Sequence, residues 1–323
     1  MEVVVRGKTM GRDIRTMNQP ARHHPVFEDF VPWSGELPPG FEVDFLGTIT
    51  RYAFEEDMSS AHKDRTNQTT PANFPGFDDE YFEWIDLLES VKQAKNKYVF
   101  IELGAGYGLW TVRAERAIKR LNPIPFHAVA VEAEPTHFEY LKQHFYDNGL
   151  NPCDHRLIRA AVWLKRGLEK FYIGNASGWY GQAIAQSGSL HSLRQWTAAF
   201  LHTVFYRLGL IQASRQRVTL VRSITLCDVL SECQYVDLLD MDIQGAELDV
   251  IARDIKVLND KVRRIHIGTH NSIVEKGLRH IFSDNGWLNI WDYQFNNTNE
   301  TPYGSIFFLD GVQTWVNPAL GDQ

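Results

Sequence analysis

The chain has 323 residues, with 33 Lys and Arg against 40 Asp and Glu, so its formal net charge is −7. Hydrophobic residues make up 44% and charged residues 23%, which is typical of a globular protein and excludes disorder over most of the length. The acidic balance disfavours nucleic acid as a partner, because affinity for phosphate backbones comes from dense Lys and Arg.

The cysteines and the distribution of apolar residues indicate where in the cell the protein is located. Cys153, Cys227 and Cys233 are odd in number and lack metal-binding spacing, so we expect neither a disulfide framework nor a zinc site. No stretch approaches the roughly 18 apolar residues that span a bilayer. The first residues lack the basic segment and apolar core of a secretory signal. We therefore expect a cytoplasmic protein without a membrane partner.

Prolines are clustered before residue 77, for example at Pro38-Pro39-Gly40 and Pro75-Gly76. Proline at this density breaks regular elements. We predict that residues 1–77 form an irregular extension that packs on a main domain of residues 78–323. The expected anchors are aromatic: Phe27, Phe30, Trp33, Phe41 and Phe45.

From residue 78 onward, strand-like and helix-like segments alternate. We predict helices over 79–94, 110–121, 135–147, 246–258 and 272–284, and strands over 98–101, 127–131, 157–162, 236–241 and 264–267. Such alternation indicates βαβ units and a mainly parallel sheet. Residues 288–293 and 305–309 have no helix between them, which predicts an antiparallel hairpin at a sheet edge. Residues 176–217 interrupt this alternation of strands and helices and are predicted to be an inserted cap.

The most informative motif is IELGAGYG at residues 101–108. Its three glycines allow a tight turn whose amides approach a ligand beside the next helix N-terminus. A pyrophosphate loop needs its third glycine at position 109, which is Leu109 here, and a Walker lysine is missing. Glu102 would repel a pyrophosphate but attract a cationic ligand such as S-adenosylmethionine. The alternative is a strand-to-helix turn whose glycines serve packing alone.

A second acidic signal follows the next strand, in VEAEP at residues 131–135. A carboxylate at this place in a doubly wound sheet can accept both ribose hydroxyls of a nucleoside. Glu132 lies at the strand tip and is the candidate for this role. Glu134, directly before Pro135, is interpreted as a charge at a helix start.

Residues 102–108 (ELGAGYG), 131–135 (VEAEP) and 236–247 (VDLLDMDIQGAE) resemble motifs of class I S-adenosylmethionine-dependent methyltransferases of the FkbM type. The resemblance covers about residues 95–310. Within the last motif, this chain has Asp240 where the family commonly has Lys and Gln244 where the first Glu is common.

The resemblance implies a doubly wound, Rossmann-like α/β sheet of strand order 3-2-1-4-5-7-6 with strand seven antiparallel. It also implies that adenine lies near Ala161 and Val162 and that Asp242 faces the methyl donor. The full set of candidate cofactor-binding residues is Glu102, Gly104, Ala105, Gly106, Tyr107, Gly108, Glu132, Ala133, Ala161, Val162 and Asp242.

Asp242 and His270 follow adjacent strands and are the catalytic candidates, because ligands bind at the carboxyl edge of such sheets. Methyl transfer requires a positioned acceptor and exclusion of water, and a hydroxyl or protonated amine also requires a base. His270 titrates in a suitable range, and Asp242 could act as the base or orient the acceptor. The alternative for His270 is a loop residue bonded to backbone. We expect His266 in the core and Asp237 and Asp240 in structural roles.

A divalent metal is a further interpretation, with Asp242, Glu247 and His270 as oxygen and nitrogen ligands. It is not favoured, because Glu247 is expected one turn into the following helix. His23 and His24 are a weaker metal candidate.

These observations predict a methyltransferase acting on oxygen or nitrogen of a small-molecule, sugar or peptide-derived acceptor. The predicted cap supplies candidate pocket residues, which are Trp179, Tyr180, Gln182 and Trp196. A nucleotide-dependent oxidoreductase is the alternative enzyme, disfavoured by Leu109 and Glu102. A non-catalytic cofactor-binding protein is the second alternative. The sequence does not identify the acceptor, because one scaffold hosts many substrates.

Overall fold

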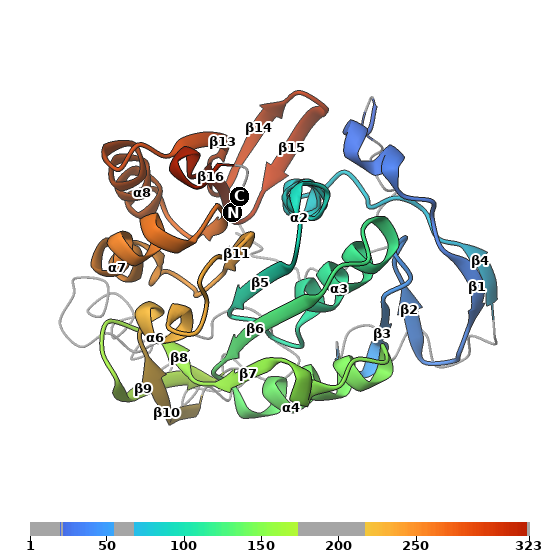
Figure 1. Cartoon of the computed structure of the whole chain (residues 1–323), viewed down its shortest axis with the longest axis horizontal. Helices are drawn as coiled ribbons and strands as arrows, with labels where there is room; N and C mark the ends of the chain where they lie inside the picture. Colours follow the sequence, from blue (N-terminus) through green and yellow to red (C-terminus); the bar gives the residue numbers. More distant parts are fainter. Residues whose placement is uncertain (1–19, 21, 55–67, 174–216, 322–323) are drawn as a thin grey trace, which may run out of the picture.

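The computed structural model describes residues 20, 22–54, 68–173 and 217–321. Its central layer is a seven-stranded sheet of order β13-β16-β12-β11-β5-β6-β7 (Figure 1). In chain order, these strands are β5 (Tyr98–Leu103), β6 (Phe126–Glu132), β7 (Arg156–Arg159), β11 (Leu238–Met241), β12 (Arg264–Thr269), β13 (Leu288–Tyr293) and β16 (Gly311–Val316). β16 is antiparallel to both of its neighbours, and the other adjacent pairs are parallel. The predicted order 3-2-1-4-5-7-6 is confirmed.

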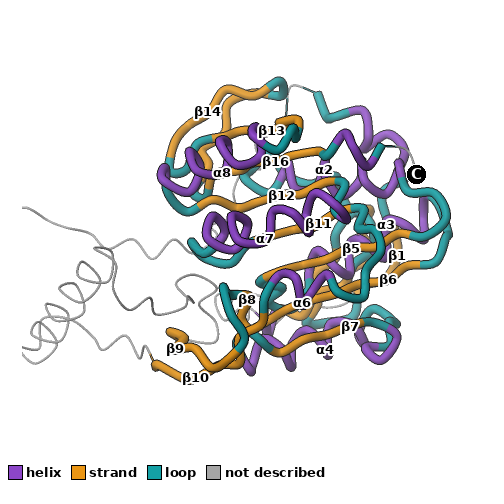
Figure 2. The backbone as a smooth tube through the Cα atoms, turned by 60° about the vertical axis from the view of Figure 1, so that its left-hand side comes forward, coloured by secondary structure: helices purple, strands orange, loops and turns teal. Residues whose placement is uncertain are grey.

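Different helices cover the two faces of the sheet (Figures 1 and 2). Tyr98 and Phe100 of β5 pack with helices α2 and α3, whereas Val99 and Ile101 join the core beneath α6, α7 and α8. Because β5 is buried on both faces, its residues are apolar from Tyr98 to Ile101, and Glu102 near its end is buried as well. The helices are α2 (Tyr81–Gln93), α3 (Leu109–Leu121), α4 (Pro135–Asp147), α6 (Leu226–Leu230), α7 (Glu247–Lys261) and α8 (Ser272–Asp284).

The predicted strand over 157–162 is divided between two sheets. β7 ends at Arg159 in the central sheet, and β8 (Ala161–Val162) pairs with β10 (Arg217–Ile224). β10 also pairs with β9 (Gly167–Ile173), which completes a three-stranded sheet. The only local sign of the break is the charged Arg159 at the end of β7, between apolar residues on either side, and a single exposed residue is also common inside a strand. The predicted cap, with Trp179, Tyr180, Gln182 and Trp196, lies outside the described residues.

The predicted terminal hairpin was wrong in its second strand. β13 pairs with β16 over 311–316, not with 305–309. Residues 305–309 fall largely in β15 (Gly304–Phe308), which pairs with β14 (Asn297–Thr301) in a separate hairpin. The sequence did not predict β16, because its polar residues Gln313 and Thr314 interrupt the apolar pattern of a buried strand, although both are fully buried. Their polar groups are satisfied internally, since Gln313 donates to the carbonyl of Glu275 and Thr314 to the carboxylate of Asp86.

The residues before α2 contain short regular elements rather than only irregular chain. Two antiparallel pairs join β1 (Ser34–Leu37) to β4 (Gln68–Pro71), and β2 (Phe41–Val43) to β3 (Ile49–Arg51), and 3-10 turns η1 and η2 cover Pro25–Asp29 and Tyr52–Phe54. Phe27, Phe30 and Phe45 are buried against α2, and Phe27 and Tyr81 have ring centroids 5.4 Å apart. Trp33 and Phe41 are half-buried. The division at residue 77 stays a prediction. None of the helices in the described ranges has the length and apolar character that crossing a bilayer requires.

Candidate active site

The glycine loop connects β5 to α3 and passes over the end of β11. Gly104, Gly106 and Gly108 all have positive φ angles, of 84°, 55° and 72°. A Cβ on Gly104 would lie 1.9 Å from the backbone oxygen of Asp242, and one on Gly108 would lie 2.2 Å from Leu141 Cδ1. Both positions therefore exclude any side chain, which explains the motif and brings the loop against Asp242. The intervening Ala105 and Tyr107 are buried.

Glu132 ends β6 and holds two loops together. One carboxylate oxygen accepts a hydrogen bond of 2.7 Å from the amide of Gly106, and the other accepts one of 2.6 Å from the amide of Glu134. Burial raises the pKa of Glu132 to about 7, although these amides favour its charged form. Each oxygen has a second lone pair, so Glu132 can still accept hydrogen bonds from a ligand. Glu134 caps α4 through the amide of His137, as expected of a helix-start acid.

Glu102 lies in a different environment from the one that its sequence position suggested. Its buried carboxylate accepts hydrogen bonds from the amide of Thr111, at 2.9 Å, and from the Thr111 hydroxyl. Burial raises the pKa of Glu102 to about 8, and the neighbouring charge of Asp240 acts in the same direction. Glu102 thus joins β5 to the first turn of α3, and its contacts in the structure are to protein rather than to an open ligand site.

The adenine-side candidates converge. Ala133 follows Glu132 at the end of β6, whereas Ala161 and Val162 form β8. Ala133 and Ala161 belong to one small apolar cluster with Phe171 and Val221. The structure therefore brings two segments that are far apart in the sequence to one apolar surface beside Glu132.

His270 is surrounded by carboxylates. Its Nε2 lies 3.1 Å from Asp242 Oδ1 and 3.9 Å from Asp310 Oδ1, and its Nδ1 lies 3.1 Å from Glu247 Oε1. Burial lowers the pKa of His270, but Asp242 and Glu247 outweigh burial and raise it to about 11. Burial acts to raise the pKa of Asp242, yet contact with His270 brings it below the usual value. These close carboxylates favour the charged imidazolium form of His270 and the ionised form of Asp242.

The same residues offer ligand atoms for a metal. Asp242, Glu247 and His270 each present one ligand atom, all within 4.8 Å of one another. The expectation that Glu247 lies one turn into the helix was wrong, because α7 begins at Glu247 and its Oε1 accepts hydrogen bonds from the amides of Ile243 and Gly245. A cation would have to displace the proton of His270. His23 and His24 belong to no such cluster within the described ranges.

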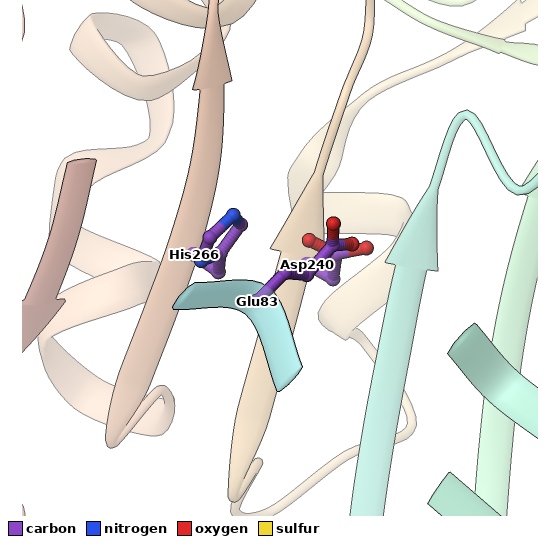
Figure 3. A group of neighbouring side chains, drawn as sticks. All are labelled: Glu83, Asp240 and His266. Carbon is purple, nitrogen blue, oxygen red and sulfur yellow. The ribbon is translucent and has the colours of Figure 1, made fainter. Parts of the chain in front are cut away.

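A second polar cluster, which the sequence did not reveal, lies between α2 and the sheet. Asp240 of β11 and His266 of β12 are in register, and Glu83 of α2 reaches them from above the sheet (Figure 3). Burial and the charge of Asp240 raise the pKa of Glu83 well above its usual range, and burial also raises the pKa of Asp240, so the pair favours one shared proton. Asp86 accepts hydrogen bonds from Arg264 and His266.

This cluster supports the structural interpretation of the buried strand residues. His266 and Asp240 are buried, and Asp237 accepts a hydrogen bond of 2.7 Å from the amide of Val99. The signal that was available is Asp86, a charged residue on the buried face of α2 between the apolar Ile85 and Leu87. Polar residues at core positions of a helix indicate buried partners.

Comparisons with known proteins agree with this geometry. The model of the methyltransferase FkbM domain matches residues 102–299, which is more than half of the chain. A protein of Jannaschia sp. (strain CCS1) named "Putative methyltransferase" is 27% identical over 295 residues, which cover 90% of this chain and 98% of that protein.

Two solved methyltransferase structures match parts of the chain at low identity and low TM-score. Methyltransferase FkbM from Methylobacillus flagellatus KT is 10% identical, with 69% of this chain and 44% of that chain covered and a TM-score of 0.38. The C-terminal domain of precorrin-6Y C5,15-methyltransferase from Rhodobacter capsulatus is 10% identical, with 71% and 84% covered and a TM-score of 0.35. The family match covers the glycine loop at residues 102–108 and the motifs at 131–135 and 236–247, and the strand order agrees with it. The chain therefore belongs to the methyltransferase FkbM domain family and is a methyltransferase.

Proposed function

We propose that the protein transfers the methyl group of S-adenosylmethionine to an oxygen or nitrogen atom of a small-molecule, sugar or peptide-derived acceptor. One observation supports this proposal most strongly. The ends of β5, β6 and β11 meet through contacts among Gly104, Gly106, Glu132 and Asp242. Gly104 packs on the carbonyl of Asp242, and Gly106 donates to Glu132. The carboxyl ends of parallel strands are where open α/β sheets bind ligands.

The residues at these strand ends fit S-adenosylmethionine better than a dinucleotide. Glu132 has lone pairs left for ribose hydroxyls, and Ala133 and Ala161 form an apolar surface that suits adenine. The ionised Asp242 favours a cationic ligand and opposes a pyrophosphate. S-adenosylmethionine would supply a methyl group bonded to a positively charged sulfur. These features support the methyltransferase proposal over the oxidoreductase alternative.

We assign proton removal to Asp242 rather than to His270. The carboxylates around His270 keep it protonated at neutral pH, so it cannot accept a proton from the acceptor. Asp242 is ionised and its side chain is half exposed, so it can reach an acceptor hydroxyl or amine. A weak base is sufficient here, because the acceptor atom becomes strongly acidic as its new bond to carbon forms. His270 then acts as a positioning residue that orients Asp242.

Calorimetric titration with S-adenosylmethionine, with NAD as the comparison ligand, tests the proposal. We expect micromolar binding of S-adenosylmethionine and no binding of NAD. Glu132→Ala should abolish the binding, whereas Glu139→Ala should not, because Glu139 is an exposed acid on α4. Binding of NAD alone would overturn the proposal in favour of the oxidoreductase alternative.

A further inference from the structure

A cavity of about 950 Å³ lies between β7, β10 and α6, beside the proposed cofactor site. Residues of β7, from the central sheet, and of β10, from the three-stranded sheet, both line it. The charged side chains that line it are Arg156, Arg159, Arg166, Arg222 and Asp228. Four guanidinium groups against one carboxylate are a strong local excess in a chain of net charge −7.

Two of the four arginines have partners within the protein. Arg166 binds both carboxylate oxygens of Asp228, with Nε 3.0 Å from each. Arg156 donates to the backbone oxygens of Val229 and Asp228, at 2.7 and 3.1 Å. These contacts hold α6 at the cavity. They also pair Asp228, the single carboxylate among the lining residues, with Arg166.

The other two arginines, Arg159 and Arg222, are available to a ligand. Both are exposed, and neither makes an ion pair or side-chain hydrogen bond with any residue in the described part of the chain. Arg159 ends β7, and Arg222 lies in β10, and both line the cavity. Two guanidinium groups without an acidic partner among the described residues, on two strands that line one cavity, suit the binding of an anion.

Register relationships connect this cavity to the cofactor side of the molecule. Arg159 is the backbone partner of Glu132 on the neighbouring strand. Arg222 directly precedes Ser223, which is the backbone partner of Ala161. Ala133 itself lines the cavity. The cavity therefore lies next to the residues proposed to contact ribose (Glu132) and adenine (Ala133 and Ala161), at the carboxyl edge of the sheet.

We infer that this cavity binds a phosphate group of the methyl acceptor, so that the acceptor is a phosphorylated small molecule. The inference rests on the proposed function, and it adds the chemical class of the substrate. Guanidinium groups match phosphate oxygens in fork geometry and remain charged at every physiological pH. The volume is that of a small-molecule site. The acceptor must then extend about 14 Å along the sheet edge to bring its reacting oxygen or nitrogen to Asp242, because β11 lies three strands from β7.

The test is calorimetric titration with inorganic pyrophosphate at fixed salt, with and without saturating S-adenosylmethionine. We expect binding to wild-type protein that is not competed by S-adenosylmethionine. The double variant Arg159→Gln/Arg222→Gln should bind pyrophosphate at least about tenfold more weakly, because it loses two charge-assisted hydrogen bonds. Its affinity for S-adenosylmethionine should be unchanged.

The matched control is Lys256→Gln/Lys276→Gln, which removes the same charge from exposed positions on α7 and α8. Equal weakening in both double variants would overturn the inference, because only the overall charge would then matter. Absence of pyrophosphate binding, or its competition by S-adenosylmethionine, would also overturn it. A 20-nucleotide RNA that binds far more tightly than pyrophosphate, with the same dependence on Arg159 and Arg222, would replace the small molecule by nucleic acid. Loss of S-adenosylmethionine binding with retained pyrophosphate binding would reject the proposed function and leave the anion site intact.

Discussion

The carboxylate of Glu132 accepts a hydrogen bond of 2.7 Å from the amide of Gly106, so the tip of β6 fixes the loop that follows β5. One side chain thereby determines the shape of the glycine loop and is also the candidate for contact with ribose. Because Glu132 is buried and its pKa is raised to about 7, its charge changes within the physiological range.

Affinity for S-adenosylmethionine is expected to rise with pH through the pKa of Glu132. At pH 6 about one tenth of the molecules have ionised Glu132, against about nine tenths at pH 8, so the apparent affinity should rise by up to about tenfold. Calorimetry at pH 6, 7 and 8 measures this change. Glu132→Gln should bind weakly with a flatter profile, and any slope that it retains reports titration of the ligand. An unchanged slope in the variant would exclude Glu132 as its source.

Stability should respond to the same group in the opposite direction. The pKa of folded Glu132 is raised from 4.5 to about 7, so its contribution to the free energy of unfolding is complete below pH 4.5 and is lost as the pH rises through 7. Thermal unfolding of wild type and Glu132→Gln at pH 5 and pH 8 should show a smaller loss in the variant. A larger loss in the variant would mean that the free carboxylate stabilises the folded state.

Gly104→Ala should disrupt the glycine loop, because the new Cβ would meet the carbonyl of Asp242 at 1.9 Å. We expect a clear fall in melting temperature and loss of S-adenosylmethionine binding. Gly149→Ala is the matched control, since Gly149 also has a positive φ, of 74°, but no atom within 4 Å of an added Cβ. The control should cost only about 1–2 kcal/mol of backbone strain. Similar losses in both variants would show that backbone strain, rather than the contact with Asp242, determines the effect.

His270 should remain protonated far above neutral pH. Its pKa is raised to about 11 by Asp242 and Glu247, against the effect of burial. Nuclear magnetic resonance of histidine ring nitrogens from pH 6 to pH 10 should show no deprotonation of His270 in wild type and a lower pKa in Asp242→Asn. A neutral His270 at pH 7 would restore it as the candidate base. It would also remove the argument for assigning proton removal to Asp242.

Phe27→Ala should destabilise the whole protein by about 3–5 kcal/mol, as other buried Phe-to-Ala changes do. Phe27 is fully buried, with its ring 5.7 Å from that of Phe74 and 5.4 Å from that of Tyr81. Val31→Ala is the control, because Val31 is 77% exposed. Urea unfolding measures both. A loss near zero for Phe27→Ala would show that the segment before α2 folds independently of the sheet.

The sequence predicted the parts of the molecule that follow from local periodicity. The predicted helix that follows Glu134 lies within a residue of its predicted bounds, and the helix over 272–284 matches them, and their starts are fixed by the side-chain oxygens of Glu134 and Asn271. The glycine loop was also predictable, since Gly104 and Gly108 occupy positions that no side chain can enter.

The features that sequence analysis missed depend on partners distant in the chain. β16 contains buried Gln313 and Thr314, whose acceptors are Glu275 on α8 and Asp86 on α2. His270 was predicted to titrate near neutrality, but three carboxylates from separate segments surround it. Glu83 gave no signal of its own, because its environment exists only after α2 packs on the sheet. Pairwise electrostatics between distant residues cannot be obtained from hydropathy.

The polar cluster of Glu83, Asp240 and His266 extends beyond the part of the chain that matches the family. The family match runs from residue 102 to 299, yet Glu83 and Asp86 precede it and β16 follows it. A fragment limited to the match would lack an interior strand of the sheet and would leave His266 without its acceptor. The flanking residues therefore belong to the same folding unit as the matched region, and a fragment bounded by the match should not fold as the whole chain does.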